Sequence, residues 1–251
     1  MLWRCYLPDI ANMANPKFIN GSIYHVCNRG VDKRTVFLAD DDRYRFIHDL
    51  FEFNDKDSVP PINLALRKYS RQSLEMTSPK IENMVRKPRK LLVEILAFCL
   101  MNNHYHLLLR QLVDGGIPLF MRKLGIGYTY YFNLKYERSG SLFQGTFKGI
   151  EIESDRQLLY IPYYIHFNPL DFEMSEWRDK ELSDYKKATD FLEKYRWSSH
   201  LDFLGVKNFP SVTQRELLLS MYGGEIGYKN SISQYLRDLD METMKDMKLI
   251  D

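Results

Sequence analysis

Two apolar segments separated by a short polar turn constrain the fold of this chain most. Residues 91–99 form a nearly continuous apolar run, and residues 104–110 form a second one after Met101-Asn102-Asn103. Apolar runs of this length, bounded by turn-forming residues, are typical of buried β-strands. The asparagines supply the chemistry of a tight reversal. The sequence therefore predicts an antiparallel hairpin at the centre of a sheet.

Further elements lie on both sides of this hairpin in the sequence. Strands are predicted over residues 23–28, before the turn at Arg29-Gly30, and within residues 143–153. Helices are predicted from the acidic cap at residues 40–42, over residues 119–135, and from the cap at Ser154-Asp155 to Asn168-Pro169. This order of elements predicts an α+β fold in which helices cover an antiparallel sheet. The open face of such a sheet suits single-stranded nucleic acid.

The pattern outside these elements divides the chain into three parts. Residues 1–17 are expected to be disordered or an artefact of start assignment, since Met13 is an alternative start. Residues 18–205 form the main domain, with a polar, proline-containing insertion at residues 54–90 that holds one short helix near residues 62–73. The basic part of that insertion, residues 67–90, is either a solvated loop or a phosphate contact. Residues 206–251 are expected to form a helical C-terminal extension.

Composition excludes several classes of protein. With 45% hydrophobic residues in 251, the chain can bury a real core, so disorder throughout is excluded. No apolar run approaches the length of a membrane span and no secretory signal is visible, so no membrane partner is expected. The three cysteines show no CxxC spacing, which favours a reducing compartment and a cytoplasmic location. A net charge of +2 does not by itself indicate a nucleic-acid binder.

The sequence His104-Tyr105-His106 opens the second strand of the hairpin. Strand side chains alternate between faces, so both imidazoles point to one face while Tyr105 points to the other. Two such rings can converge on one metal ion. The alternative is a chance pair of solvated or core histidines, because a His-x-His motif alone is weakly specific.

A second group of candidate residues lies in the predicted helix that ends at Asn168-Pro169. Tyr164 and Asn168 are four residues apart and share a helix face. An amide oxygen is a suitable third ligand for a hard divalent cation, and a phenol one turn earlier could attack a phosphate held there. The alternative is that Tyr160, Tyr163, Tyr164 and Phe167 are an aromatic core stripe.

Taken together, these segments resemble the single-tyrosine HUH transposases of the insertion-sequence two-hundred type, most closely the branch of REP-associated tyrosine transposases. The motifs occur in family order between residues 18 and 204. They are Tyr24-His25-Val26-Cys27-Asn28-Arg29-Gly30, Phe37-Leu38-x-Asp40, Met101-Asn102-Asn103-His104-Tyr105-His106-Leu107-Leu108, Gly140-Ser141-Leu142-Phe143-Gln144-Gly145-x-Phe147-Lys148, Tyr164-Ile165-His166-Phe167-Asn168-Pro169 and Trp197-Ser198-Ser199.

The resemblance implies a ferredoxin-like (RRM-like) sandwich of the HUH endonuclease type. By that resemblance, His104, His106 and Asn168 would hold Mg²⁺ or Mn²⁺, with no energy cofactor, and Tyr164 would be the nucleophile. The implied reaction nicks and rejoins single-stranded DNA at hairpin or palindromic sites, through a 5′-phosphotyrosine that leaves a 3′-OH. The protein would act as a monomer or a homodimer.

Several alternatives remain open from the sequence. Arg29, Arg122, Lys123 and Lys148 are candidate DNA-phosphate contacts, although isolated basic residues are often only solvated surface. His25 is either a neighbour of the metal site or a core histidine. The residues that rank second to Tyr164 as nucleophile are Tyr128, Tyr130 and Tyr131. The alternative functions are a domesticated or inactive module that binds single-stranded nucleic acid, and a metal-dependent nuclease that uses water.

Overall fold

The computed structural model describes residues 15–57, 89–179, 182 and 184–238. Several predictions lie outside these residues. They are the state of residues 1–14, the short helix near residues 62–73, almost all of the basic segment at residues 67–90, and the last part of the C-terminal extension, residues 239–251.

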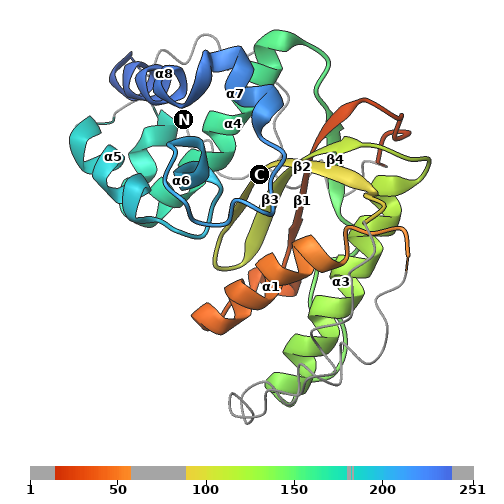
Figure 1. The fold of residues 1–251 in the computed structure, drawn as a ribbon. Coiled ribbons are helices and arrows are strands. Elements are labelled where there is room, and N and C mark those ends of the chain that lie inside the picture. Colours follow the sequence, from red (N-terminus) through yellow and green to blue (C-terminus); the bar gives the residue numbers. More distant parts are fainter. Residues whose placement is uncertain (1–14, 58–88, 180–181, 183, 239–251) are drawn as a thin grey trace, which may run out of the picture.

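The described residues form one four-stranded antiparallel sheet (Figure 1). Its strands are β1 (Ile23–Arg29), β2 (Val93–Leu100), β3 (His104–Gln111) and β4 (Lys148–Glu151), in the spatial order β2-β3-β1-β4. The hairpin of β2 and β3 is therefore confirmed, with Leu100 paired to Tyr105 beside the turn. This strand order, with helices between the strands, is the ferredoxin-like arrangement, and the predicted α+β class is confirmed.

The fourth strand lies within residues 143–153, as the sequence predicts. Its regular pairing begins at Lys148 and not earlier in that range. Phe143 is buried and makes an isolated bridge to Gly30, and Gly145 then adopts a left-handed conformation with φ of 68°. That turn interrupts the ladder, since a residue with positive φ cannot continue a strand.

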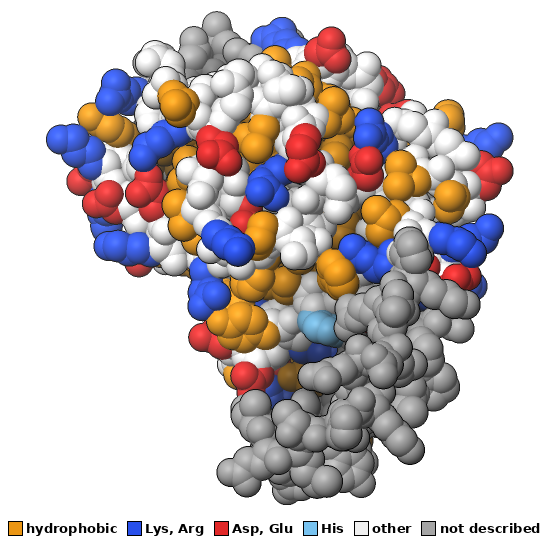
Figure 2. Space-filling model, viewed as in Figure 1, with side chains coloured by type: hydrophobic (Ala, Val, Ile, Leu, Met, Phe, Trp, Pro, Cys, Tyr) orange, Lys and Arg blue, Asp and Glu red, His pale blue; other side chains and the backbone are white. Residues whose placement is uncertain are grey.

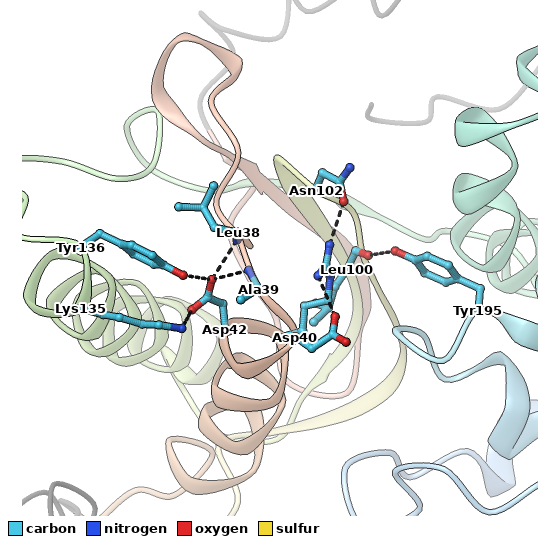
Figure 3. A network of polar contacts seen from close by, with 10 residues as sticks. Leu38, Ala39, Asp40, Asp42, Leu100, Asn102, Lys135, Tyr136 and Tyr195 are labelled. Atoms are coloured by element: carbon cyan, nitrogen blue, oxygen red, sulfur yellow. Dashed lines mark hydrogen bonds and ion pairs between the residues drawn. The ribbon is translucent and has the colours of Figure 1, made fainter. Parts of the chain in front are cut away.

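One face of the sheet is covered by α1 (Asp40–Glu52) and α3 (Gly116–Lys135), which lie together on one side of the sheet in Figure 1. The acidic start of α1 was predicted as a cap. In the structure Ala39 is the N-cap residue, and Oδ2 of the buried Asp42 accepts the N–H groups of Leu38 and Ala39, each at 2.9 Å. The same carboxylate also accepts from Lys135, the last residue of α3, and from Tyr136, its C-cap residue (Figure 3). Asp42 therefore joins the two helices of this layer.

The other face is covered by a helical group that includes the C-terminal part of the chain (Figure 1). Its elements are α4 (Asp155–Phe167), α5 (Tyr185–Lys194), α6 (His200–Phe203), α7 (Glu216–Tyr222), α8 (Gly224–Asp238) and the 3₁₀ turns Asn168–Phe172 and Ser175–Asp179; a further 3₁₀ turn, Val31–Lys33, follows β1. Ser154 caps α4 as predicted, accepting from the N–H of Gln157. Leu218 and Tyr228 share one core with α4, so α7 and α8 pack into the main body.

The turn between β2 and β3 is held from both layers (Figure 3). Arg43 of α1 donates to Asn102 Oδ1 at 2.9 Å, while Tyr195 Oη donates to the carbonyl of Leu100 at 2.5 Å. Because His104 follows this turn directly, these contacts fix where β3 begins. Among the described residues, no helix is both long enough and apolar enough to cross a membrane.

Candidate functional site

The two histidines of β3 lie on the face of the sheet that α4 covers. Tyr105, between them, lies on the opposite face and packs against Phe46 and Phe143 in the core under α1 and α3. The rings of His104 and His106 are 4.9 Å apart between centroids and nearly perpendicular. Strand alternation thus brings both imidazoles to one place, as the sequence predicts.

A third histidine, His25 on β1, completes this cluster. Its Nε2 lies 2.9 Å from Nδ1 of His106, and the two rings are stacked with an interplanar angle of 17°. The sequence left His25 open between a core residue and a neighbour of the pair. In the structure it is both, since it is buried and directly contacts His106.

Tyr164 of α4 lies against the histidines. Its ring centroid is 5.7 Å from that of His25 and 5.8 Å from that of His106, in edge-on arrangements. The tyrosines of the predicted aromatic stripe do not all face the same neighbours, because Tyr160 and Tyr163 pack against Tyr235 of α8. Of these three tyrosines of α4, Tyr164 is therefore the one that faces the histidine cluster.

Asn168 lies at the C-terminal end of α4, and both ends of its amide make a hydrogen bond. Its Nδ2 donates to the carbonyl of Tyr164 at 2.8 Å, and its Oδ1 accepts from Nη2 of Arg178 at 3.0 Å. Arg178 also pairs with Asp171 at 2.8 Å and 2.9 Å, and its guanidinium lies 5.8 Å from the ring centroid of Tyr164. Sequence reasoning missed Arg178, because it belongs to a short 3₁₀ turn with no motif of its own.

The electrostatic environment keeps the imidazoles neutral. Burial, assisted by the charges of Arg29 and Arg178, lowers the pKa of His104 to about 3, and burial alone lowers the pKa of His25 to about 3. Burial is also the main reason that the pKa of His106 lies well below its usual value, and the charges of the neighbouring histidines and arginines add to it. Neutral imidazoles keep a lone pair for a metal ion, and two nearby guanidinium groups favour an anion.

The side chains fit the divalent-cation site that the sequence predicted. Asn103 Nδ2 donates to the carbonyl of Lys33 at 3.1 Å, so its Oδ1 is the acceptor for Nδ1–H of His104 at 2.6 Å. The lone pair of His104 is then on Nε2. Nε2 of His106 is buried and has no hydrogen-bond partner among the described residues, and Asn168 Oδ1 has a second lone pair. In the part of the chain that the structure describes, no group of three or more His, Cys, Asp or Glu side chains is placed so that it could hold a metal ion, and a third ligand beside His104 and His106 would therefore be the Asn168 amide.

The predicted DNA contacts lie in different places. Arg29 pairs with His104 in the β1–β3 register, and its Nε is buried without a described partner. Lys148 opens β4, opposite Cys27. Arg122 and Lys123 belong to α3, in the layer away from the histidines, and Lys123 Nζ donates to the carbonyls of Asp55 and Asp57. Of these four residues, Arg29 is the one whose charge acts on His104 and His106.

On the face shown in Figure 2, basic and acidic side chains are interspersed rather than gathered into one basic patch.

Two of the tyrosines that rank second to Tyr164 as nucleophile use their hydroxyls elsewhere in the fold. The hydroxyl of the buried Tyr128 donates to the carbonyl of Val36 at 2.6 Å, and that of Tyr131 donates to Asp42 at 3.0 Å. The Tyr131 hydroxyl therefore joins α3 to α1, and the Tyr128 hydroxyl joins α3 to the segment before α1, both in the layer on the other side of the sheet from His106.

Comparisons with known proteins give a likeness of fold. No protein-family model matches the chain, and no curated protein matches it significantly. A solved structure described as a REP-associated tyrosine transposase bound to a REP hairpin is similar, with a TM-score of 0.46 and 13% identity, over 79% of this chain and 89% of the other. A likeness of this size does not assign an activity to this chain.

Proposed function

We propose that this protein nicks and rejoins single-stranded DNA at hairpin sites, with Tyr164 as the nucleophile. The observation that carries the proposal is the position of the Tyr164 ring, 5.8 Å from the neutral His106 and 5.8 Å from the guanidinium of Arg178. A phenol, a cation that suits a phosphate and neutral metal-ligand histidines are the groups that phosphodiester exchange requires.

In the proposed reaction, Tyr164 Oη attacks the phosphorus of one phosphodiester. The Oη–P bond forms as the P–O3′ bond breaks, and the phenolic proton passes, in net, to the departing 3′ oxygen. The products are a 5′-phosphotyrosine and a free 3′-OH. Attack by the 3′-OH of a second strand reverses the exchange, and the proton returns to Oη.

The surrounding side chains have distinct roles in this proposal. His104 and His106 through Nε2, and Asn168 through Oδ1, would hold Mg²⁺ or Mn²⁺, which supplies Lewis-acid polarisation of the phosphate when bound. Arg178 and Arg29 would bind the non-bridging phosphate oxygens, since both guanidinium groups influence the histidines electrostatically. Arg122, Lys123 and Lys148 remain candidate contacts to DNA outside the site.

Burial favours a second candidate, a module that binds single-stranded nucleic acid without cutting it. Tyr164 is only 3% exposed and His106 is fully buried, so a phosphate reaches them only after the surrounding side chains move. A protein that never opens this site would bind DNA and leave it intact. A nuclease that activates water in place of the phenol is the remaining alternative.

A denaturing gel separates these functions. The protein is incubated with a labelled hairpin DNA and Mn²⁺, and a labelled protein–DNA adduct that survives denaturation is expected. Tyr164→Phe should abolish the adduct, whereas Tyr163→Phe, whose hydroxyl bonds Ser231 on α8, should keep it. An adduct that persists in Tyr164→Phe would overturn the nucleophile. Cleavage without an adduct would indicate the water mechanism, and binding alone would indicate the module.

A further inference from the structure

The contact between His25 and His106 joins two buried imidazole rings, with one hydrogen between the two contacting nitrogens. With both rings neutral, one of the two nitrogens in the 2.9 Å contact donates and the other accepts. Outside this contact, Nδ1 of His25 and Nε2 of His106 are both buried without a hydrogen-bond partner among the described residues. Two tautomeric arrangements of the pair are therefore available, and they differ in which outer nitrogen carries hydrogen.

The two arrangements differ in their consequence for metal binding. If His25 donates, Nε2 of His106 carries hydrogen and cannot bind a cation. If His25 accepts, the proton of His106 is on Nδ1, and its Nε2 presents a lone pair. His104 is already held in the second way, because Asn103 Oδ1 accepts from its Nδ1. An acceptor at the outer nitrogen of a ligand histidine fixes its tautomer and ring orientation.

We propose that His25 is a positioning residue, which accepts Nδ1–H of His106 and thereby directs the His106 Nε2 lone pair at the metal ion. The role rests on the proposed function, since it requires His106 to be a ligand. Asn103 and His25 then have the same role, since Asn103 accepts Nδ1–H of His104 and His25 accepts Nδ1–H of His106. Their alignment comes from the sheet, because β1 and β3 are neighbours and His106 pairs in register with Cys27, two residues from His25.

Metal affinity provides the first test, measured as loss of the free Mn²⁺ electron paramagnetic resonance signal in the presence of single-stranded DNA. His25→Leu removes the acceptor and should weaken Mn²⁺ binding about ten- to hundred-fold. His25→Gln should restore most of the affinity, because its Oε1 can accept in place of Nε2. The matched control is His200→Leu, which removes a different buried histidine and should leave Mn²⁺ affinity unchanged.

The outcomes distinguish this role from the proposed function. Wild-type affinity in His25→Leu, or an equal loss in His25→Gln and His25→Leu, would overturn the positioning role while leaving the metal site intact. Absence of Mn²⁺ binding by the wild type would overturn the metal site itself.

A second measurement needs no variant. Long-range ¹H–¹⁵N spectra of the wild type with Zn²⁺, a diamagnetic probe, should show hydrogen on Nδ1 of His106 and metal at Nε2. Hydrogen on Nε2 of His106 in the Zn²⁺ complex would contradict the role of His25.

Discussion

Arg178 donates from Nη2 to Oδ1 of Asn168 at 3.0 Å, while the Nδ2 of the same amide donates to the carbonyl of Tyr164 at 2.8 Å. One amide thus links the guanidinium to the helix that carries the candidate nucleophile. Asp171 accepts two further hydrogen bonds from Arg178, through Nε and Nη2. The guanidinium is therefore fixed in place beside Tyr164 before any substrate arrives.

Replacing Arg178 should slow the proposed reaction more than it weakens DNA binding. Arg178→Ala removes a preorganised cation next to the reacting phosphate, and a loss of about 10²-fold in the rate of adduct formation is expected. The rate is measured by quenched single-turnover assays with a labelled hairpin. Arg110→Ala, on the same sheet but paired with Glu94, is the matched control. An unchanged rate in Arg178→Ala would contradict the role of Arg178 in the proposed reaction.

Removing the divalent cation should stop adduct formation reversibly. Chelation by EDTA is expected to abolish the adduct in the gel assay, and excess Mn²⁺ should restore it in the wild type. His106→Ala lacks a ligand nitrogen, so Mn²⁺ should not restore its activity at the same concentration. Full activity in EDTA would show that the chemistry proceeds without a metal ion.

The buried carboxylate of Asp42 should contribute strongly to stability. Asp42→Asn removes the negative charge that faces Lys135 and weakens hydrogen bonds from α3, which should lower the free energy of unfolding by about 1.5–3 kcal/mol. The exposed Asp41, on the same helical turn, provides the control as Asp41→Asn. Urea unfolding of both variants at neutral pH measures the difference, and equal midpoints would contradict the role of Asp42.

The Asp42 carboxylate should also make the free energy of unfolding depend on pH in the acid range. Burial would raise the pKa of Asp42, but hydrogen bonds from Lys135 and Tyr136 outweigh it and hold that pKa below its usual value. In this case the unfolded chain binds a proton first, so the stabilisation is present above about pH 4 and disappears as the pH falls through the lower, folded pKa. Unfolding curves taken on both sides of pH 4 should therefore show a smaller acid loss in Asp42→Asn.

The buried His200 should make the free energy of unfolding depend on pH at higher pH than Asp42 does. Burial lowers its pKa to about 3 in the folded protein, whereas an unfolded histidine titrates near 6.5, as a rough reference value. Between these values the unfolded chain binds one more proton, so stability falls as the pH falls, by up to about 1.4 kcal/mol per pH unit. In His200→Gln this slope should be smaller, as measured by urea unfolding between pH 7.5 and 5. Parallel curves for the two proteins would contradict the prediction.

Local pattern was enough to predict the elements that carry the site. The apolar runs on both sides of residues 101–103 specified the hairpin, and strand alternation placed His104 and His106 on one face. The Ser154 cap and the spacing of Tyr164 and Asn168 specified one helix, with Tyr164 in its C-terminal half and Asn168 as its C-cap residue. Each of these features depends on residues within a few positions of one another.

Other parts of the site could not be predicted in this way. His25 and His106 are 81 residues apart in the sequence, and their contact depends on the register of β1 against β3. Arg178 reaches Asn168 because the 3₁₀ turns after α4 fold back, and no periodicity describes such turns. The short β4 likewise depends on the burial of Phe143 and on the turn at Gly145.

The sequence by itself determined the elements, the shared face of the two β3 histidines and the shared helix of Tyr164 and Asn168. Only the tertiary structure decided that Tyr164, rather than Tyr163, meets the imidazoles, and that His25 and Arg178 lie beside them. The physical reason is that backbone hydrogen bonding and side-chain alternation act over a few residues, whereas strand register and the rotation of α4 depend on burial of apolar surface from the whole chain.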